Sequence, residues 1–148
     1  MAVVSKVGSK ESEDAARKIA KKFLAKKSTV FTISPIEVEG AKKVETLDEL
    51  KKEKLDLVVT LGGDGTTLRV FRYLENDTPI LTINVGGNRG ILSEITIDEI
   101  DDAIDKILKD KFFLDKRTRV VASCGGKEFP PALNEIYICR TNLTKTAE

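Results

Sequence analysis

The chain has 148 residues, of which 41% are hydrophobic and 33% are charged, a balance typical of a globular protein rather than a disordered one. Its net charge of +1 gives no bulk attraction toward nucleic acid or a membrane surface, so we expect neither as a partner. The sequence contains no histidine, which excludes Ser-His-Asp and Cys-His catalysis and histidine-bound metals. Acid–base chemistry therefore falls to carboxylates, Lys, Tyr or Cys, and any metal ion would be a hard cation such as Mg²⁺.

The two cysteines, Cys124 and Cys139, are not part of a CxxC pair, so no zinc or redox motif is indicated. We expect both thiols to be buried in a protein of the reducing cytosol, with a disulfide as the alternative. The apolar runs are far shorter than the roughly 20 residues that span a bilayer. Charged residues from Lys6 onward do not fit a signal peptide. These features predict a cytoplasmic protein.

Strands and helices are predicted to alternate along the first part of the chain. The predicted strands are residues 2–7, 29–33, 55–61 and 79–83. A first helix is marked by apolar residues at helical spacing between Ala16 and Leu24. Two capping boxes, at 46–49 and 96–99, predict two more helices, and a further helix of about ten residues should follow residue 66. This alternation predicts an α/β fold with an open, mainly parallel sheet and helices on both faces.

The pattern changes after Lys111. Residues 112–122 and 135–140 are predicted to be extended strands, with no long helix between them. We therefore interpret residues 1–110 as an α/β nucleotide-binding domain. Residues 111–148 would be the beginning of a β-rich second domain that is incomplete in this sequence.

The segment most suggestive of function is the turn Gly62-Gly63-Asp64-Gly65-Thr66, between an apolar strand and a helix. Ligands of open α/β sheets bind outside the carboxyl ends of the strands, where this turn would lie. Glycines let the backbone approach a ligand closely, and the first N–H groups of the helix suit phosphate oxygens. Thr66 can either cap the helix or donate to a phosphate. A carboxylate repels phosphate, so Asp64 is expected to face a sugar hydroxyl or a phosphate-bound Mg²⁺.

The helix N-terminus favours the ionised form of Asp64, which would make this residue a weak but well-positioned base. The alternative interpretation is a tight turn between strand and helix that has no ligand. An aspartate flanked by glycines after a buried strand favours a functional site. The spacing matches neither the Walker A motif nor G-x-G-x-x-G.

The segment from Leu57 to Leu68 resembles the GGDGT signature of the NAD kinase family, which lipid kinases of the diacylglycerol and sphingosine type share. Residues 83–94 resemble the family's I-N-x-G-x-x-G-F-L-[ST] loop, with Ile91 in place of Phe and one residue more before Gly90. Lipid kinases instead carry a Gly-Asn-Asp run there, which is missing. Residues 132–135 resemble the family's A-L-N-E/D motif. These motifs occur in the family's order and identify the chain as similar to the N-terminal portion of an NAD kinase.

The resemblance implies an NAD kinase/phosphofructokinase-like fold and an enzyme that phosphorylates the adenosine ribose 2′-hydroxyl of NAD to give NADP. ATP or polyphosphate would be the phosphoryl donor. Asp64 would be the catalytic residue that orients or deprotonates the hydroxyl. The remaining nucleotide-binding residues would be Gly62, Gly63, Gly65, Thr66 and Arg69 around the turn, and Asn134 and Glu135 at the adenosine part of the dinucleotide. Mg²⁺ or another divalent cation would act with the phosphates, and no residue is predicted to be a protein ligand of a metal.

The family continues into a second glycine- and threonine-rich stretch that completes the NAD pocket, and this sequence lacks it. We therefore expect the turn to be half of a pocket, in a truncated part that need not be active alone. The chain shows no obvious catalytic Lys or Arg, which would come from the remaining portion or a partner subunit. A homo-oligomer, dimer or tetramer, is implied for the longer protein. The alternatives are a lipid kinase and a non-catalytic nucleotide-binding module.

Overall fold

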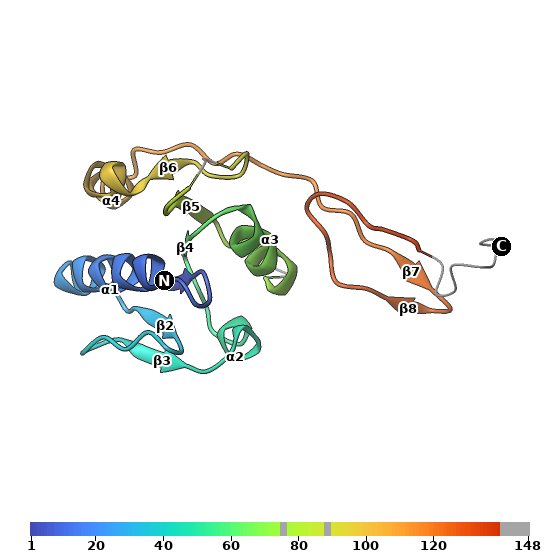
Figure 1. Cartoon of the computed structure of the whole chain (residues 1–148), viewed down its shortest axis with the longest axis horizontal. Helices are drawn as coiled ribbons and strands as arrows, with labels where there is room; N and C mark the ends of the chain where they lie inside the picture. The colour runs from blue at the N-terminus through green and yellow to red at the C-terminus, as the bar shows by residue number, and fades with distance from the viewer. Residues whose placement is uncertain (75–76, 88–89, 140–148) are drawn as a thin grey trace.

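One parallel sheet forms the centre of the fold (Figure 1). The computed structural model describes residues 1–74, 77–87 and 90–139. The strands run in the order β3-β2-β1-β4-β5-β6, and all neighbouring pairs are parallel. Their bounds are β1 (Ala2–Ser5), β2 (Phe31–Ile33), β3 (Lys42–Val44), β4 (Val58–Leu61), β5 (Ile80–Asn84) and β6 (Ile95–Thr96). The predicted open, mainly parallel sheet is confirmed.

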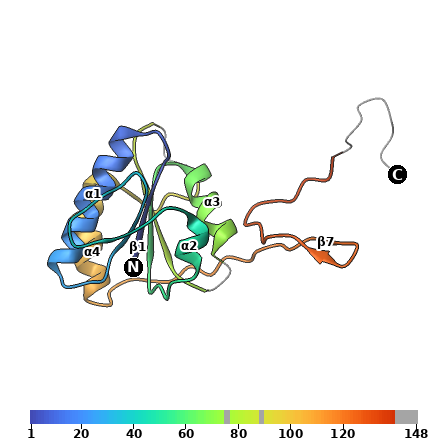
Figure 2. The ribbon, with the colours of Figure 1, turned by 90° about the horizontal axis from the view of Figure 1, so that it is seen from below.

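Helices cover both faces of the sheet, as predicted. They are α1 (Lys10–Ala25), α2 (Leu47–Lys51), α3 (Asp64–Tyr73) and α4 (Ile100–Leu108), the last preceded by the 3₁₀ turn η1 (Ile97–Glu99). Figure 2 shows α1 and α4 on one face and α2 and α3 on the other. Two clusters of buried side chains fill the two interfaces. One joins Ile19 and Phe23 of α1 to Ile104 of α4, and the other joins Leu50 of α2 to Val70 of α3.

Local sequence signals explain where the helices begin. The Ser9 hydroxyl accepts the Ser12 N–H at 3.3 Å and so caps α1. The Thr46 hydroxyl accepts the Glu49 N–H at 3.2 Å at the start of α2. The capping box at Thr96 is complete, although the first turn that it opens is 3₁₀ rather than α-helical. Both predicted capping boxes therefore start a helical segment.

The strand order reverses between β1 and β4. From β1 the chain proceeds outward to β2 and β3, and it then returns to place β4 on the other side of β1. Ser5, the last residue of β1, lies opposite Leu61, the last residue of β4. The residues that follow these two strands therefore flank a topological switch point, where open α/β sheets bind their ligands.

Two edge strands, β3 and β6, were not predicted from the sequence, and two other predicted strands are longer than those observed. The strands β3 and β6 have three and two residues, too few to give a periodic signal. The long strands predicted at 112–122 and 135–140 do not form among the described residues. The chain there holds only the short antiparallel pair β7 (Ser123–Cys124) and β8 (Lys127–Glu128) and one bridge between Val120 and Ala132. Arg140 lies outside the described residues. An extended segment without a neighbouring strand cannot complete its backbone hydrogen bonds as a sheet does.

Among the described residues, the segment after α4 contributes no side chain to a buried hydrophobic cluster. All members of the two buried clusters precede residue 105, and Figures 1 and 2 both show β7 projecting away from the central sheet. Cys124 and Cys139 are therefore exposed free thiols, and the prediction that both are buried is wrong. The division of the chain near residue 110 stays a prediction. Among the described residues, no helix combines the length and the apolar character needed to cross a membrane.

Candidate functional site

Only Gly62 and Gly63 separate the end of β4 from the start of α3. The N–H of Gly62 donates to the Ile83 carbonyl at 3.0 Å, so the turn starts while still paired with β5. The helix begins at Asp64, and Gly63 occupies the N-cap position without a side-chain cap. Thr66 thus lies inside the first turn of α3, and of its two predicted roles capping is wrong. The Thr66 N–H donates to the Gly63 carbonyl at 3.0 Å, so the N–H groups of Asp64 and Gly65 are the ones at the start of α3 that are available to a ligand.

The glycines of the turn are required for different reasons. Gly62 has a φ of 147°, and a Cβ placed there would lie 2.7 Å from the Thr66 hydroxyl and 2.9 Å from the Lys6 Cβ. The fold itself therefore requires glycine at this position. A Cβ at Gly63 or at Gly65 would meet nothing within 4 Å. The fold therefore leaves room for a side chain at these two positions. Glycine there is better explained by a ligand that approaches the backbone closely.

The Asp64 carboxylate is held in a fixed direction by the loop that follows β5. Its Oδ2 accepts the Ile91 N–H at 3.0 Å, and its Oδ1 accepts the Leu92 N–H at 3.1 Å. Gly90 lies against the same carboxylate, since a Cβ there would be 2.8 Å from Oδ2 and would overlap Oδ1. The two segments that resemble family motifs, at 57–68 and 83–94, are thus brought together around Asp64.

Buried hydroxyls hold both segments in place. The Thr60 and Thr67 hydroxyls are hydrogen-bonded at 3.1 Å and join β4 to α3 beneath the turn. The Thr82 hydroxyl donates to the Leu92 carbonyl and accepts the Glu94 N–H at 2.9 Å. The position of the Asp64 carboxylate is therefore set by hydrogen bonds from two neighbouring strands.

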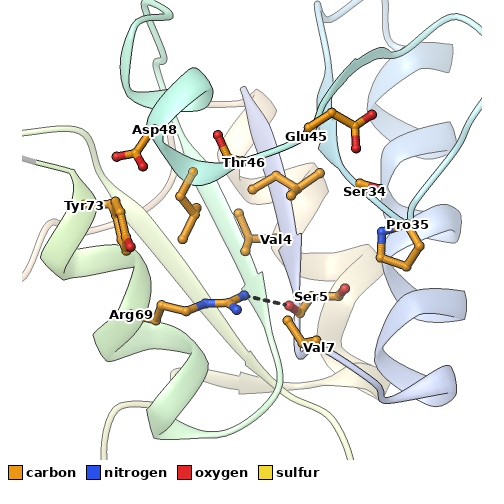
Figure 3. Close-up of a pocket in the computed structure, with 12 residues that line it drawn as sticks. Val4, Ser5, Val7, Ser34, Pro35, Glu45, Thr46, Asp48, Arg69 and Tyr73 are labelled. Carbon is orange, nitrogen blue, oxygen red and sulfur yellow. Dashed lines mark hydrogen bonds between the residues drawn. The ribbon is translucent and has the colours of Figure 1, made fainter.

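On another side of the turn lies a hollow of about 410 Å³, lined by Lys6, Val7, Gly63, Gly65, Thr66 and Arg69. A second hollow, of about 300 Å³, lies between the ends of β1 and β2 and the helices α2 and α3 (Figure 3). Arg69 lines both hollows. Its guanidinium donates to the Ser5 carbonyl at 3.4 Å, and its Nε is buried without a hydrogen-bond partner among the described residues.

Lys6 was not among the predicted site residues. It follows β1, and its N–H donates to the Leu61 carbonyl at 2.8 Å, which places it directly beside Gly62. Nothing in the local sequence distinguishes this lysine from the other lysines of the chain. Only the strand order, which puts β1 next to β4, shows that Lys6 and the turn belong to one site.

The structure does not bring Asn134 and Glu135 to the turn. Both are exposed, and the described residues contain no hydrogen bond or ion pair between them and residues 62–69. The Glu135 carboxylate instead accepts a hydrogen bond from the Tyr137 hydroxyl, which raises the pKa of Tyr137. Their assignment to the adenosine part of a dinucleotide stays a prediction.

The described residues offer no protein cage for a metal ion, because no three Cys, Asp or Glu side chains come together. A resident metal cofactor does not fit such a site. Mg²⁺ in nucleotide enzymes is commonly bound through one or two carboxylates together with substrate phosphates.

The family model described as "ATP-NAD kinase N-terminal domain" matches residues 1–112. The chain belongs to the NAD kinase family. It is 38% identical over 94 residues to an NAD kinase of Thermococcus sibiricus, covering 64% of this chain and 34% of that relative. It is 34% identical over 139 residues to an NAD kinase of Clostridium beijerinckii, covering 90% of this chain and 48% of that relative. Family membership does not favour the lipid-kinase alternative.

Solved structures of the family share the fold. A yeast NADH kinase complexed with NADH superposes with a TM-score of 0.70 at 16% identity, over 88% of this chain and 45% of that one. An Archaeoglobus fulgidus NAD kinase in complex with ATP gives a TM-score of 0.60 at 24% identity, over 90% of this chain and 45% of that one. The chain spans about a third to a half of the length of these relatives.

Proposed function

We propose that this chain is the N-terminal, nucleotide-binding part of an NAD kinase that transfers a phosphoryl group from ATP to the adenosine ribose 2′-hydroxyl of NAD. The observation that carries the proposal is the Asp64 carboxylate, held by the Ile91 and Leu92 N–H groups beside a glycine turn at the switch point of a parallel sheet. Family membership supports the proposed reaction, and this geometry supports the proposed roles of Asp64 as a base and of the turn as a phosphate site.

In the proposed step the 2′-hydroxyl oxygen forms a bond to the γ-phosphorus of ATP, and the bond from that phosphorus to the β,γ-bridging oxygen breaks. The bonding electrons leave with ADP, and the hydroxyl proton passes to the Asp64 carboxylate. Each carboxylate oxygen already accepts one N–H and has a second lone pair for a substrate hydroxyl. Phosphoryl transfer depends mainly on positioning and charge neutralisation, so a fixed carboxylate and a glycine turn suit it.

The open positions Gly63 and Gly65, together with Thr66, are proposed to contact the nucleotide phosphates, and Mg²⁺ would enter with them. Asn134 and Glu135 are proposed to bind the adenosine part of NAD in the native protein. We also propose that the native protein is cytoplasmic and forms a homo-oligomer.

The test measures NADP formation from ATP and NAD by the native protein, with an NADP-specific dehydrogenase as the reporter. Asp64→Asn keeps the shape of the side chain but removes its basicity, and we expect kcat to fall by about 10²–10⁴-fold. The matched control is Asp105→Asn, the same chemical change at an exposed position of α4. A folded native protein that forms no NADP would refute the kinase assignment. Full activity of Asp64→Asn would refute the catalytic role alone.

A further inference from the structure

Arg119 attaches the segment that follows α4 to the C-terminal end of α3. Residues 111–139, here called the arm, extend away from the central sheet, and α3 is the helix nearest to the β7–β8 hairpin of the arm in both views (Figures 1 and 2). Arg119 is half-buried, whereas the other residues from 111 to 121 are exposed. Its Nη1 donates to the Phe71 carbonyl at 3.2 Å and to the Leu74 carbonyl. The arm is therefore anchored to the domain at this residue.

The contact suits the chemistry of a helix end. The last carbonyls of a helix have no partner within it, and they form the negative end of the helix dipole. A guanidinium has several N–H donors and can bind two such carbonyls at once, as Arg119 does here. Leu74, the C-cap residue, is 3% exposed and packs in the same buried cluster as Val70 and Leu50. The arm is therefore attached to a well-packed part of the domain.

Backbone pairing extends this attachment to the segment that is proposed to bind adenosine. Val120 follows Arg119 directly and exchanges two backbone hydrogen bonds with Ala132. The Val120 N–H donates to the Ala132 carbonyl at 2.8 Å, and the Ala132 N–H donates to the Val120 carbonyl at 2.9 Å. Asn134 and Glu135 follow shortly after Ala132. Two residues of extended chain span at most about 7 Å, so fixing Ala132 restricts where Asn134 can lie.

The same helix carries Asp64 at its other end. α3 extends from Asp64 to Tyr73, a length of about 15 Å at about 1.5 Å per residue. Its first residue is bound by the Ile91 and Leu92 N–H groups, and its last turn is bound by Arg119. One packed helix therefore joins the proposed catalytic carboxylate to the arm that bears the proposed adenosine-binding residues.

We propose that Arg119 is a positioning residue for the acceptor dinucleotide, because it sets the direction in which the arm leaves α3 and so places Asn134 and Glu135 relative to Asp64. This inference rests on the proposed kinase activity and adds to it the residue that links the two parts of the acceptor site. Arg119 acts through the Val120–Ala132 pair and not by contact with the substrate. Without Arg119 the arm must be ordered when NAD binds, and this ordering lowers the affinity.

The test measures NAD and ATP affinities by calorimetry on the native protein, and KM for both substrates in the NADP assay. Arg119→Gln should weaken NAD by about tenfold or more and raise its KM by a similar factor. ATP should be unaffected, because its proposed contacts lie in the glycine turn. Arg119→Lys keeps a cation at the helix end and should restore much of the NAD affinity. The control is Arg117→Gln, since Arg117 is an exposed arginine of the same arm that binds Asp115 within it, and it should change neither ligand.

A double-mutant cycle tests whether Arg119 acts through the arm. Replacing both Asn134 and Glu135 by alanine should weaken NAD by about tenfold or more. Adding Arg119→Gln to that variant should weaken NAD by less than about threefold further, because the groups that Arg119 positions are already gone. Circular dichroism and thermal denaturation show whether each variant is folded at the temperature of the titration.

The contrary outcomes are distinct. If Arg119→Gln lowers Tm but leaves NAD affinity unchanged, Arg119 only caps α3 and the inference is refuted. It is refuted as well if Arg119→Gln weakens ATP as much as NAD, or if its effect on NAD is undiminished without Asn134 and Glu135. If Arg119→Gln does not fold, an NAD affinity for Arg119→Lys no higher than that of the variant without Asn134 and Glu135 refutes it too, since the cation would then not be what positions the arm. The affinities do not depend on turnover, so an absence of NADP formation would be recognised separately as a failure of the proposed function.

Discussion

Replacing Gly65 by alanine tests whether glycine is needed at this position by the fold or by a bound ligand. Gly65 is the second residue of α3, and the space around an added methyl group is empty to 4 Å. Alanine is more stable than glycine in a helix by about 0.5–1 kcal/mol. We take the lower value because the position lies in the first turn. For a domain of this size, about 0.5 kcal/mol raises Tm by roughly 1–2 °C.

Nucleotide affinity should change in the opposite direction. The added methyl would project into the hollow beside Thr66, where we place the phosphates. Displacing a closely packed ligand by one methyl costs about 1–3 kcal/mol, which corresponds to roughly a 5- to 150-fold loss of ATP affinity. Thermal denaturation followed by circular dichroism and calorimetric titration with ATP measure the two effects on one protein. A lower Tm, or an unchanged ATP affinity, would show that the close approach of a ligand does not explain this glycine.

Three further substitutions test the surrounding structure. Gly62→Ala should destabilise the protein by about 2 kcal/mol or more in urea denaturation, because the backbone is at positive φ and the methyl would press on Thr66. Gly90→Ala should push the Asp64 carboxylate from its amide donors and lower NADP formation by about 100-fold, with less than about 2 kcal/mol lost in stability. Ile104→Ala, in the core between α4 and the sheet, should cost about 2–5 kcal/mol by the same denaturation assay.

The controls for these substitutions come from the same elements. Leu108→Ala removes an aliphatic side chain from α4 that is 42% exposed, so it should cost much less than Ile104→Ala. An equal cost at both positions would contradict the burial described for this helix. For Gly90, unchanged activity would show that the contact with Asp64 is unnecessary for the reaction. A wild-type denaturation midpoint for Gly62→Ala would show that the turn can relax without strain.

Much of the fold was readable from the sequence because its signals are local. The apolar run before Gly62, the threonines that cap the later helices, and the periodic apolar face of α1 each depend on residues close in the chain. The edge strands β3 and β6 gave no such signal, because two or three paired residues carry no periodicity. The exposure of Cys124 was mispredicted for a related reason, since burial depends on what packs against a segment and not on the residue type alone.

The sequence by itself determined the chemistry that the site can carry: no histidine, a glycine turn with one carboxylate at Asp64, and motifs that resemble one kinase family. The tertiary structure alone decided which residues share that site. It placed Lys6 beside Gly62, 56 positions later in the numbering, and turned the Asp64 carboxylate to the amides of residues 91 and 92. Strand pairing in a parallel sheet joins residues that are distant in sequence, so no local pattern could have shown that one turn presents a base on one side and two cations on the other.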